Sequence, residues 1–89
     1  MSRVQIRYCT QCQWLLRSAW YAQELLSTFG EALNEVALSP AHGGTFEIWC
    51  DEHLLWERKR DGGFPDIKVL KQQVRNHVEP SRDLGHTDR

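Results

Sequence analysis

The sequence lacks any long hydrophobic run. No apolar stretch among its 89 residues approaches the ~20 residues that a membrane-spanning helix requires. The segment from Met1 to Arg7 alternates polar and apolar side chains, so it does not contain the apolar core of about 7–15 residues that a signal peptide has. These absences predict a protein with neither a membrane segment nor a secretory leader.

An excess of charge of either sign is also missing. Eleven Lys and Arg residues face 12 Asp and Glu residues, which gives a formal net charge of −1. Binding to nucleic acid or to anionic lipid is favoured by a basic surface, which this balance does not supply. The locally charged run from Glu57 to Asp61 is expected to be a solvated strand end. We therefore expect neither nucleic acid nor a membrane among the partners.

Cysteine is scarce and odd in number, with only Cys9, Cys12 and Cys50. A secreted disulfide scaffold uses an even number of cysteines, so this count favours the reducing cytoplasm. A four-thiolate zinc site would need a second cysteine pair, and none of the four histidines forms a His-x₃₋₅-His pair. The sequence therefore predicts a cytoplasmic protein without a metal site.

Four short segments are predicted as strands. The segment from Arg3 to Tyr8 alternates polar and apolar residues, which is typical of a strand with one face in water. Three further strands are expected, and the last two form a hairpin: residues 35–38, 45–50 and 54–58. The second strand is expected to end before Ser39-Pro40, and the hairpin register is expected to pair Trp49 with Trp56.

Two longer segments are predicted as helices. The first follows the strand at the N-terminus and is expected to bury an apolar stripe: Leu15, Leu16, Ala19, Ala22, Leu25, Leu26 and Phe29. Asp66 is a good N-cap for the second helix, which ends at Val78. Residues 79–89 show no periodicity and are expected to form a tail that is flexible or draped over the surface. A single domain is therefore expected over residues 1–78.

The order of these elements is strand, helix, strand, strand, strand, helix. A strand–helix–strand unit with a crossover of this length is expected to be parallel and right-handed, and the hairpin adds antiparallel strands. Because Arg3, Gln5 and Arg7 mark a wet face, both helices are expected on the other face. The sequence therefore predicts an α/β fold, a thioredoxin-like two-layer sandwich with a four-stranded mixed sheet and both helices on one face.

The segment Cys9-Thr10-Gln11-Cys12 lies at the predicted junction of the first strand and the first helix. This spacing brings two sulfurs within reach of a disulfide, and the first turn of a helix stabilises a thiolate through its free N–H groups and dipole. The thiolate is the nucleophile of thiol–disulfide exchange. Cys9 and Cys12 are therefore the candidate catalytic pair, expected near the surface, whereas Cys50 is expected in the core.

Three tryptophans are candidates for a partner surface. Trp14, two residues after Cys12, is either a hydrophobic lip for a docking partner or part of the core. Trp49 and Trp56 are expected on the open face of the sheet, where an exposed aromatic pair marks contact with a partner or a second copy of the chain. The alternative is a cross-strand pair that stabilises the sheet and has no role in binding.

Several separate motifs together resemble the selenoprotein W-like family. They lie between Val4 and Val78: Tyr8-Cys9-Thr10-Gln11-Cys12, Trp14-Leu15-Leu16-Arg17, Gln23-Glu24-Leu25-Leu26, Gly44-Thr45-Phe46-Glu47-Ile48 and Gly62-Gly63-Phe64-Pro65. The resemblance implies a thioredoxin-like fold and a thiol-based redox role, with glutathione or protein thiols as partners. Selenoprotein members carry selenocysteine at the second motif position, which here is Cys12. No cofactor is expected, apart from glutathione as a co-substrate.

Two functions are compatible with these features. The first is a thiol–disulfide oxidoreductase in which Cys9 and Cys12 reduce or exchange disulfides or glutathione mixed disulfides. The second is a redox-switched binding module, in which oxidation of the pair changes recognition of a protein partner without turnover. The attacking sulfur is also open, because the analogy with thioredoxin favours Cys9 and the position of selenium in the family favours Cys12.

Overall fold

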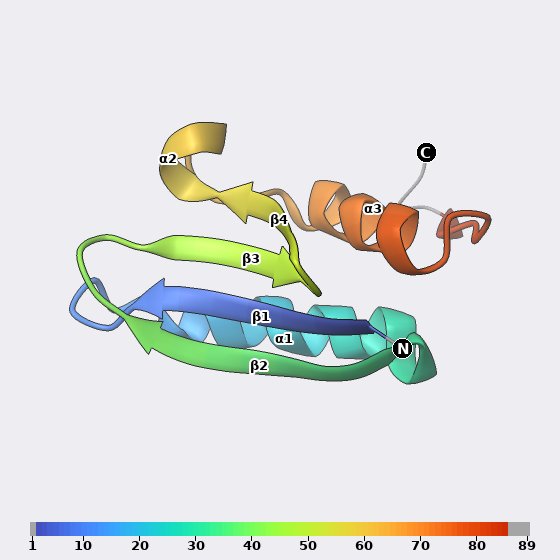
Figure 1. Ribbon diagram of the computed structural model, residues 1–89, viewed down its shortest axis with the longest axis horizontal. Coiled ribbons are helices and arrows are strands. Elements are labelled where there is room, and N and C mark those ends of the chain that lie inside the picture. The colour runs from blue at the N-terminus through green and yellow to red at the C-terminus, as the bar shows by residue number, and fades with distance from the viewer. Residues whose placement is uncertain (1, 86–89) are drawn as a thin grey trace.

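A four-stranded mixed sheet runs through the computed structural model, which describes residues 2–85 (Figure 1). The central strand β1 (Ser2–Cys9) pairs in parallel with β2 (Leu33–Ala41) and antiparallel with β3 (Phe46–Cys50). The strand β4 (His53–Glu57) pairs antiparallel with β3, which gives the order β2-β1-β3-β4. The predicted four-stranded mixed sheet is confirmed.

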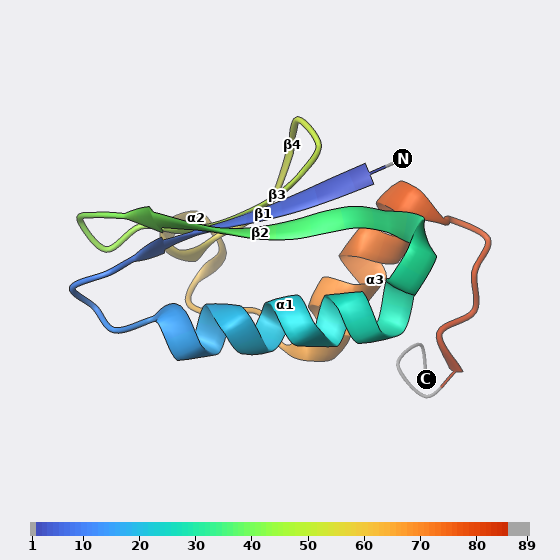
Figure 2. The same ribbon diagram turned by 90° about the horizontal axis from the view of Figure 1, so that it is seen from below.

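Both long helices lie on the same face of this sheet, as Figure 2 shows. The helix α1 (Leu15–Phe29) connects β1 to β2 and continues into a 3₁₀ turn, η1 (Gly30–Ala32). The helix α3 (Ile67–Val78) packs beside α1, and the Asp66 carboxylate caps it by accepting the Lys68 N–H at 2.8 Å. The two-layer arrangement is therefore confirmed. No helix within the described residues is long and apolar enough to cross a membrane.

The other face of the sheet is open and polar. Arg3 forms an ion pair with Glu35 of β2, and Arg7 forms one with Glu47 of β3 at 2.8 Å. Gln5 lies between the two arginines, and its side chain donates a hydrogen bond to a serine of β2 at 2.9 Å. The alternation of Arg3, Gln5 and Arg7 with buried residues in β1 is thus explained by water on one face and the helices on the other.

The buried face of α1 differs from the predicted stripe. Three leucines expected in the core are exposed: Leu15 (47%), Leu16 (82%) and Leu26 (43%). Ser18 and Tyr21 are buried instead. The Tyr21 hydroxyl donates a hydrogen bond to the Pro65 carbonyl at 2.7 Å, and its ring centroid lies 5.9 Å from that of Phe46. The helix is rotated toward this aromatic side chain, whose hydroxyl is satisfied inside the fold.

The strand β2 is longer than predicted. It does not end before Ser39-Pro40 but continues to Ala41, with Pro40 opposite Tyr8 of β1. Proline has no N–H to donate to a neighbouring strand. It is tolerated in β2 because β2 is an edge strand and has a neighbour on one side only.

The charged run from Glu57 to Asp61 is exposed at Lys59 and Arg60, as expected, but the prediction that it is a strand end is wrong. The strand β4 ends at Glu57, whose carboxylate accepts the N–H groups of Lys59 and Arg60, both at 2.8 Å. It thereby caps a single helical turn, α2 (Arg58–Asp61).

The predicted pairing of Trp49 with Trp56 is also wrong. A bulge between Ile48 and Trp49 shifts the register, so that Trp56 lies opposite Ile48 and Trp49 lies opposite Leu54. Trp56 packs against the core, and its indole N–H donates to the Gly63 carbonyl at 2.8 Å. Only Trp49 of the predicted pair lies on the open face.

Part of the C-terminal tail contacts the two helices. The Arg82 guanidinium donates to the Thr28 carbonyl at 2.7 Å and lies 5.3 Å from the centroid of the Phe29 ring. Leu84 packs against the core. Residues 86–89 of the predicted tail lie outside the described residues.

Replacing Tyr21 with phenylalanine tests how the loop before α3 is held. The change leaves the Pro65 carbonyl without its partner, so we expect Tyr21→Phe to lower the free energy of unfolding by about 1–2 kcal/mol in urea denaturation. Tyr8→Phe is the matched control, because the Tyr8 hydroxyl has no hydrogen-bond partner among residues 2–85. Equal losses in the two variants would contradict this role of the Tyr21 hydroxyl.

Candidate functional site

The two motif cysteines lie at the end of β1, before α1 begins. Cys9 is the last residue of β1, and its N–H donates to the Thr45 carbonyl at 2.8 Å. Gln13 has a φ of 60°, in the left-handed region, so the right-handed helix cannot extend back through it to Cys12. The expectation that the first turn of the helix stabilises a thiolate of this motif is therefore wrong, because α1 starts only at Leu15.

The two sulfurs are close neighbours, and neither is part of a disulfide. A hydrogen bond between the Cys9 and Cys12 side chains lowers the pKa of Cys9 and raises the pKa of Cys12. This direction corresponds to a Cys12 thiol that donates to a Cys9 thiolate. The pair can thus hold one proton between two sulfurs, which is the ionisation state that thiol–disulfide exchange requires.

Backbone amides of two loops take the place of the expected helix terminus. The Gly44 amide, in the loop between β2 and β3, donates to both sulfurs and lowers the pKa of each. The amides of Gln11 and Cys12 also donate to the Cys9 sulfur. Gly44 has a φ of 74°, which favours glycine at this position. Such a group of converging N–H donors stabilises an anion.

The three cysteines differ in their access to solvent. Cys12 is partly exposed, whereas only 2% of Cys9 is exposed. The expectation that both motif cysteines lie near the surface is thus wrong for Cys9, which is covered because it ends a central strand. Cys50 is fully buried, as predicted, and its burial raises the pKa of its thiol to about 11.

An aromatic cluster of Trp14, Phe46 and Phe64 adjoins the motif. The Phe64 ring centroid lies 5.0 Å from that of Trp14 and 4.9 Å from that of Phe46, both with edge-to-face geometry. Phe64 is held there because Trp56 and Tyr21 donate hydrogen bonds to the two residues that flank it. Trp14 is half-buried, so it belongs to the core at one edge and to the surface beside Cys12 at the other.

Two arginines stack on this aromatic cluster. The Arg17 guanidinium carbon lies 4.1 Å from the Phe64 centroid, and that of Arg58 lies 4.9 Å from the Trp14 centroid. The positive charge of Arg58 also lowers the pKa of Cys12. Sequence analysis does not identify either arginine as a site residue. Their contacts with Phe64 and Trp14 form only in the folded chain, where the capped turn α2 brings Arg58 close to the motif.

Comparison with known proteins gives one family and several related structures, among them two crystal structures of bacterial proteins. A model described as the Rdx family matches residues 3–76. The structure is similar to a crystal structure of a protein from Bordetella parapertussis, with 64% sequence identity and a TM-score of 0.85 over 86% of this chain and 98% of that chain. It is also similar to a crystal structure of a selenoprotein W-related protein from Vibrio cholerae, with 55% identity and a TM-score of 0.86 over 88% of this chain and 98% of that chain. A search of curated proteins gave no match.

Thiol labelling of the folded, reduced protein tests the order of access. We expect Cys12 to react with iodoacetamide first, and Cys50 to react roughly 100-fold more slowly, because its thiol is buried and its pKa is raised to about 11. Peptide mass analysis of timed samples assigns each rate. In urea all three thiols should react at similar rates. Comparable rates for Cys12 and Cys50 in the folded protein would contradict the assignment.

Substituting Arg58 tests the electrostatic contact with the motif. Arg58→Gln removes a positive charge that lowers the pKa of Cys12, so the pKa read from the pH dependence of Cys12 alkylation should rise. Lys59→Gln is the matched control, since it removes the same charge from the next residue without touching the aromatic cluster. An equal rise in both variants would mean that net charge, and not the position of Arg58, sets the effect.

Proposed function

The chain belongs to the Rdx family, and from that premise we propose that it is a thiol–disulfide oxidoreductase whose working groups are Cys9 and Cys12. The observation that carries the proposal is the closeness of the two thiols, which lowers the pKa of Cys9 and raises that of Cys12, beside loop amides that lower the pKa of Cys9 further. A purely structural pair would have no need for this anion-stabilising surrounding. A C-x-x-C pair in a chain with three cysteines also fits the reducing cytoplasm, and we propose that compartment for the protein.

We assign the attack to Cys12 and the resolving step to Cys9. Cys9 has the lower pKa of the two, but it is only 2% exposed. The two sulfurs of a substrate disulfide therefore cannot line up with the Cys9 sulfur, as attack on a disulfide requires. Cys12 is partly exposed, and transfer of its proton to the Cys9 thiolate gives a Cys12 thiolate at the surface. Because the shared proton can move from one sulfur to the other, either sulfur can become the thiolate. The exposure of each sulfur to the substrate therefore decides which one attacks.

The reaction then proceeds in two exchanges. The Cys12 thiolate attacks one sulfur of a substrate disulfide, forms a mixed disulfide and releases the first substrate thiol. Cys9, as a thiolate, then attacks the Cys12 sulfur, releases the second substrate thiol and leaves an oxidised Cys9–Cys12 pair. Two electrons pass to the substrate, with the one proton that the pair holds and a second proton from water. Two molecules of a low-molecular-mass thiol such as glutathione then reduce the Cys9–Cys12 disulfide and leave as their own disulfide.

The surface beside Cys12 favours a substrate that carries negative charge. Arg17 and Arg58 supply two positive charges, while Trp14 and Phe64 supply the apolar rings on which the guanidinium groups stack. Glutathione has two carboxylates and a peptide backbone, which match this combination of charge and apolar surface. We therefore propose glutathione mixed disulfides of proteins as substrates, with Trp14 as the lip that the partner contacts. Contact of a partner or a second copy with the open face at Trp49 stays a prediction.

Replacing each motif cysteine separately tests the order of attack. In Cys9→Ser the resolving sulfur is missing, so a mixed disulfide with glutathione should accumulate on Cys12 when the protein is mixed with oxidised glutathione. In Cys12→Ser the attacker is missing, and no adduct should form. Intact-mass analysis counts the adduct, and a coupled assay with catalytic amounts of protein should show turnover only for the unsubstituted chain.

Cys50→Ser serves as the matched control, because it removes a thiol of the same kind that lies in the core. It should keep both the adduct chemistry and the turnover. Adduct in Cys12→Ser but not in Cys9→Ser would reverse the two roles. Absence of adduct in both variants, together with no turnover, would overturn the enzyme proposal in favour of a redox-switched binding module.

A further inference from the structure

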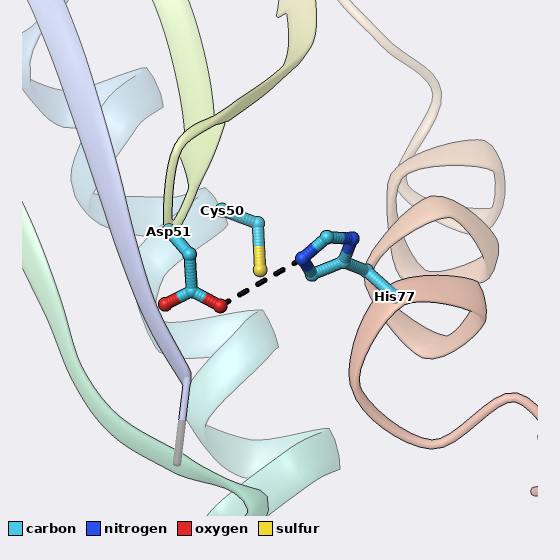
Figure 3. Close-up of side chains that lie close together, drawn as sticks. All are labelled: Cys50, Asp51 and His77. Carbon is cyan, nitrogen blue, oxygen red and sulfur yellow. Dashed lines mark ion pairs between the residues drawn. The ribbon is translucent and has the colours of Figure 1, made fainter.

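A second group of chemically active side chains lies at the end of the sheet opposite the redox pair. Within residues 2–85, the Cys50 sulfur, an Asp51 carboxylate oxygen and a His77 ring nitrogen all lie within 4.8 Å of one another (Figure 3). They come from the end of β3, the hairpin turn and the last turn of α3. Thiolate, carboxylate and imidazole are the three ligand types that zinc takes in proteins.

The hairpin turn holds the Asp51 carboxylate in place. The Arg3 N–H donates to Oδ1 of Asp51 at 3.0 Å, and the Asp51 N–H donates back to the Arg3 carbonyl at 2.8 Å. Oδ2 therefore faces Nε2 of His77, at 3.7 Å. A carboxylate that is anchored by one oxygen and directed by the other is oriented as a metal ligand requires.

A second imidazole adjoins the same group. His53 lies opposite Cys50 in the hairpin, and its ring centroid is 4.4 Å from that of His77. The Asp51 and His77 side chains are 39% and 26% exposed, so an ion can reach them from solvent, while the Cys50 thiol lies beneath them in the core. The group thus has a route of entry, a buried soft ligand and a nearby donor for a fourth position.

We propose that Cys50, Asp51 and His77 form a binding site for Zn²⁺, with His53 or a water molecule as the fourth ligand. Zinc bonds of about 2.0–2.3 Å place tetrahedral ligand atoms roughly 3.3–3.8 Å apart, so small side-chain rotations suffice to close the group. Binding exchanges the thiol proton of Cys50 for the metal, and the proton leaves to solvent. The bound ion joins the β3–β4 hairpin to α3 at the point where the Asp51–His77 ion pair already links them.

Titration with Co²⁺, a spectroscopic substitute for Zn²⁺, tests the site. The chain used carries Cys9→Ser and Cys12→Ser, which leaves Cys50 as the only thiol, so a thiolate-to-cobalt absorption band can arise only there. We expect one Co²⁺ per chain, displaced by one Zn²⁺. Absence of the band, or a stoichiometry of zero in calorimetry with Zn²⁺, would overturn the proposal, whatever the result for the redox pair.

Ligand substitutions in the same background complete the test. His77→Gln and Asp51→Asn each remove a metal ligand, so each should weaken Zn²⁺ binding by more than about 100-fold. Loss of only a ligand's hydrogen-bond partner costs roughly 10–100-fold in metal affinity. Both residues are partly exposed, so these variants are expected to fold even if Cys50→Ala does not. His42→Gln, in the loop between β2 and β3, is the matched control and should bind as the parent does. Unchanged affinity in His77→Gln would overturn the site.

Discussion

The central position of β1 is the constraint on which both ends of the molecule depend. This strand is hydrogen-bonded to β2 on one side and to β3 on the other, so neither end can shift without breaking a ladder. Just beyond the ladder, the Cys9 N–H donates to the Thr45 carbonyl at one end, and the Arg3 N–H donates to the Asp51 carboxylate at the other. The Cys9–Cys12 pair and the proposed zinc site therefore lie at opposite ends of β1, which holds one residue against each.

Side chains beneath the sheet determine the surroundings of Cys9 and Cys12. The loop before α3 carries Phe64 and is held from below by hydrogen bonds from Trp56 and Tyr21. Phe64 and Trp14 in turn provide the ring faces on which two arginines stack. Because the two loop-anchoring donors are hydrogen-bonded inside the fold, the positions of the positive charges beside Cys12 follow from the packing of the core.

Patterns of polarity in the sequence predict the fold well and the details of contact poorly. The alternation at Arg3, Gln5 and Arg7 correctly places the wet face, because exposure of a sheet face is a property of every second residue. The rotation of α1 and the register of Trp56 are not predictable in this way. The first depends on a hydroxyl that is satisfied by a distant carbonyl, and the second on a bulge that interrupts the alternation.

The candidate site also has one part that can be predicted from the sequence and one part that cannot. The pairing of Cys9 with Cys12 follows from their spacing, since two intervening residues bring the sulfurs together. The Gly44 amide and the Arg58 charge come from other segments of the chain, and their contact with the sulfurs exists only after folding. Interactions of this kind leave no periodic or local trace in a single sequence.

The place of β1 in the chain has a consequence for biosynthesis. This strand leaves the ribosome before its partner β3, which ends at Cys50, so the ladder on both sides of β1 cannot form until Cys50 has been made. Until then Cys9 and Cys12 lack the Gly44 amide and ionise as ordinary thiols in an extended chain. The nascent polypeptide thus carries two equivalent thiols, and the division into one thiol of lowered pKa and one of raised pKa arises only when the sheet closes.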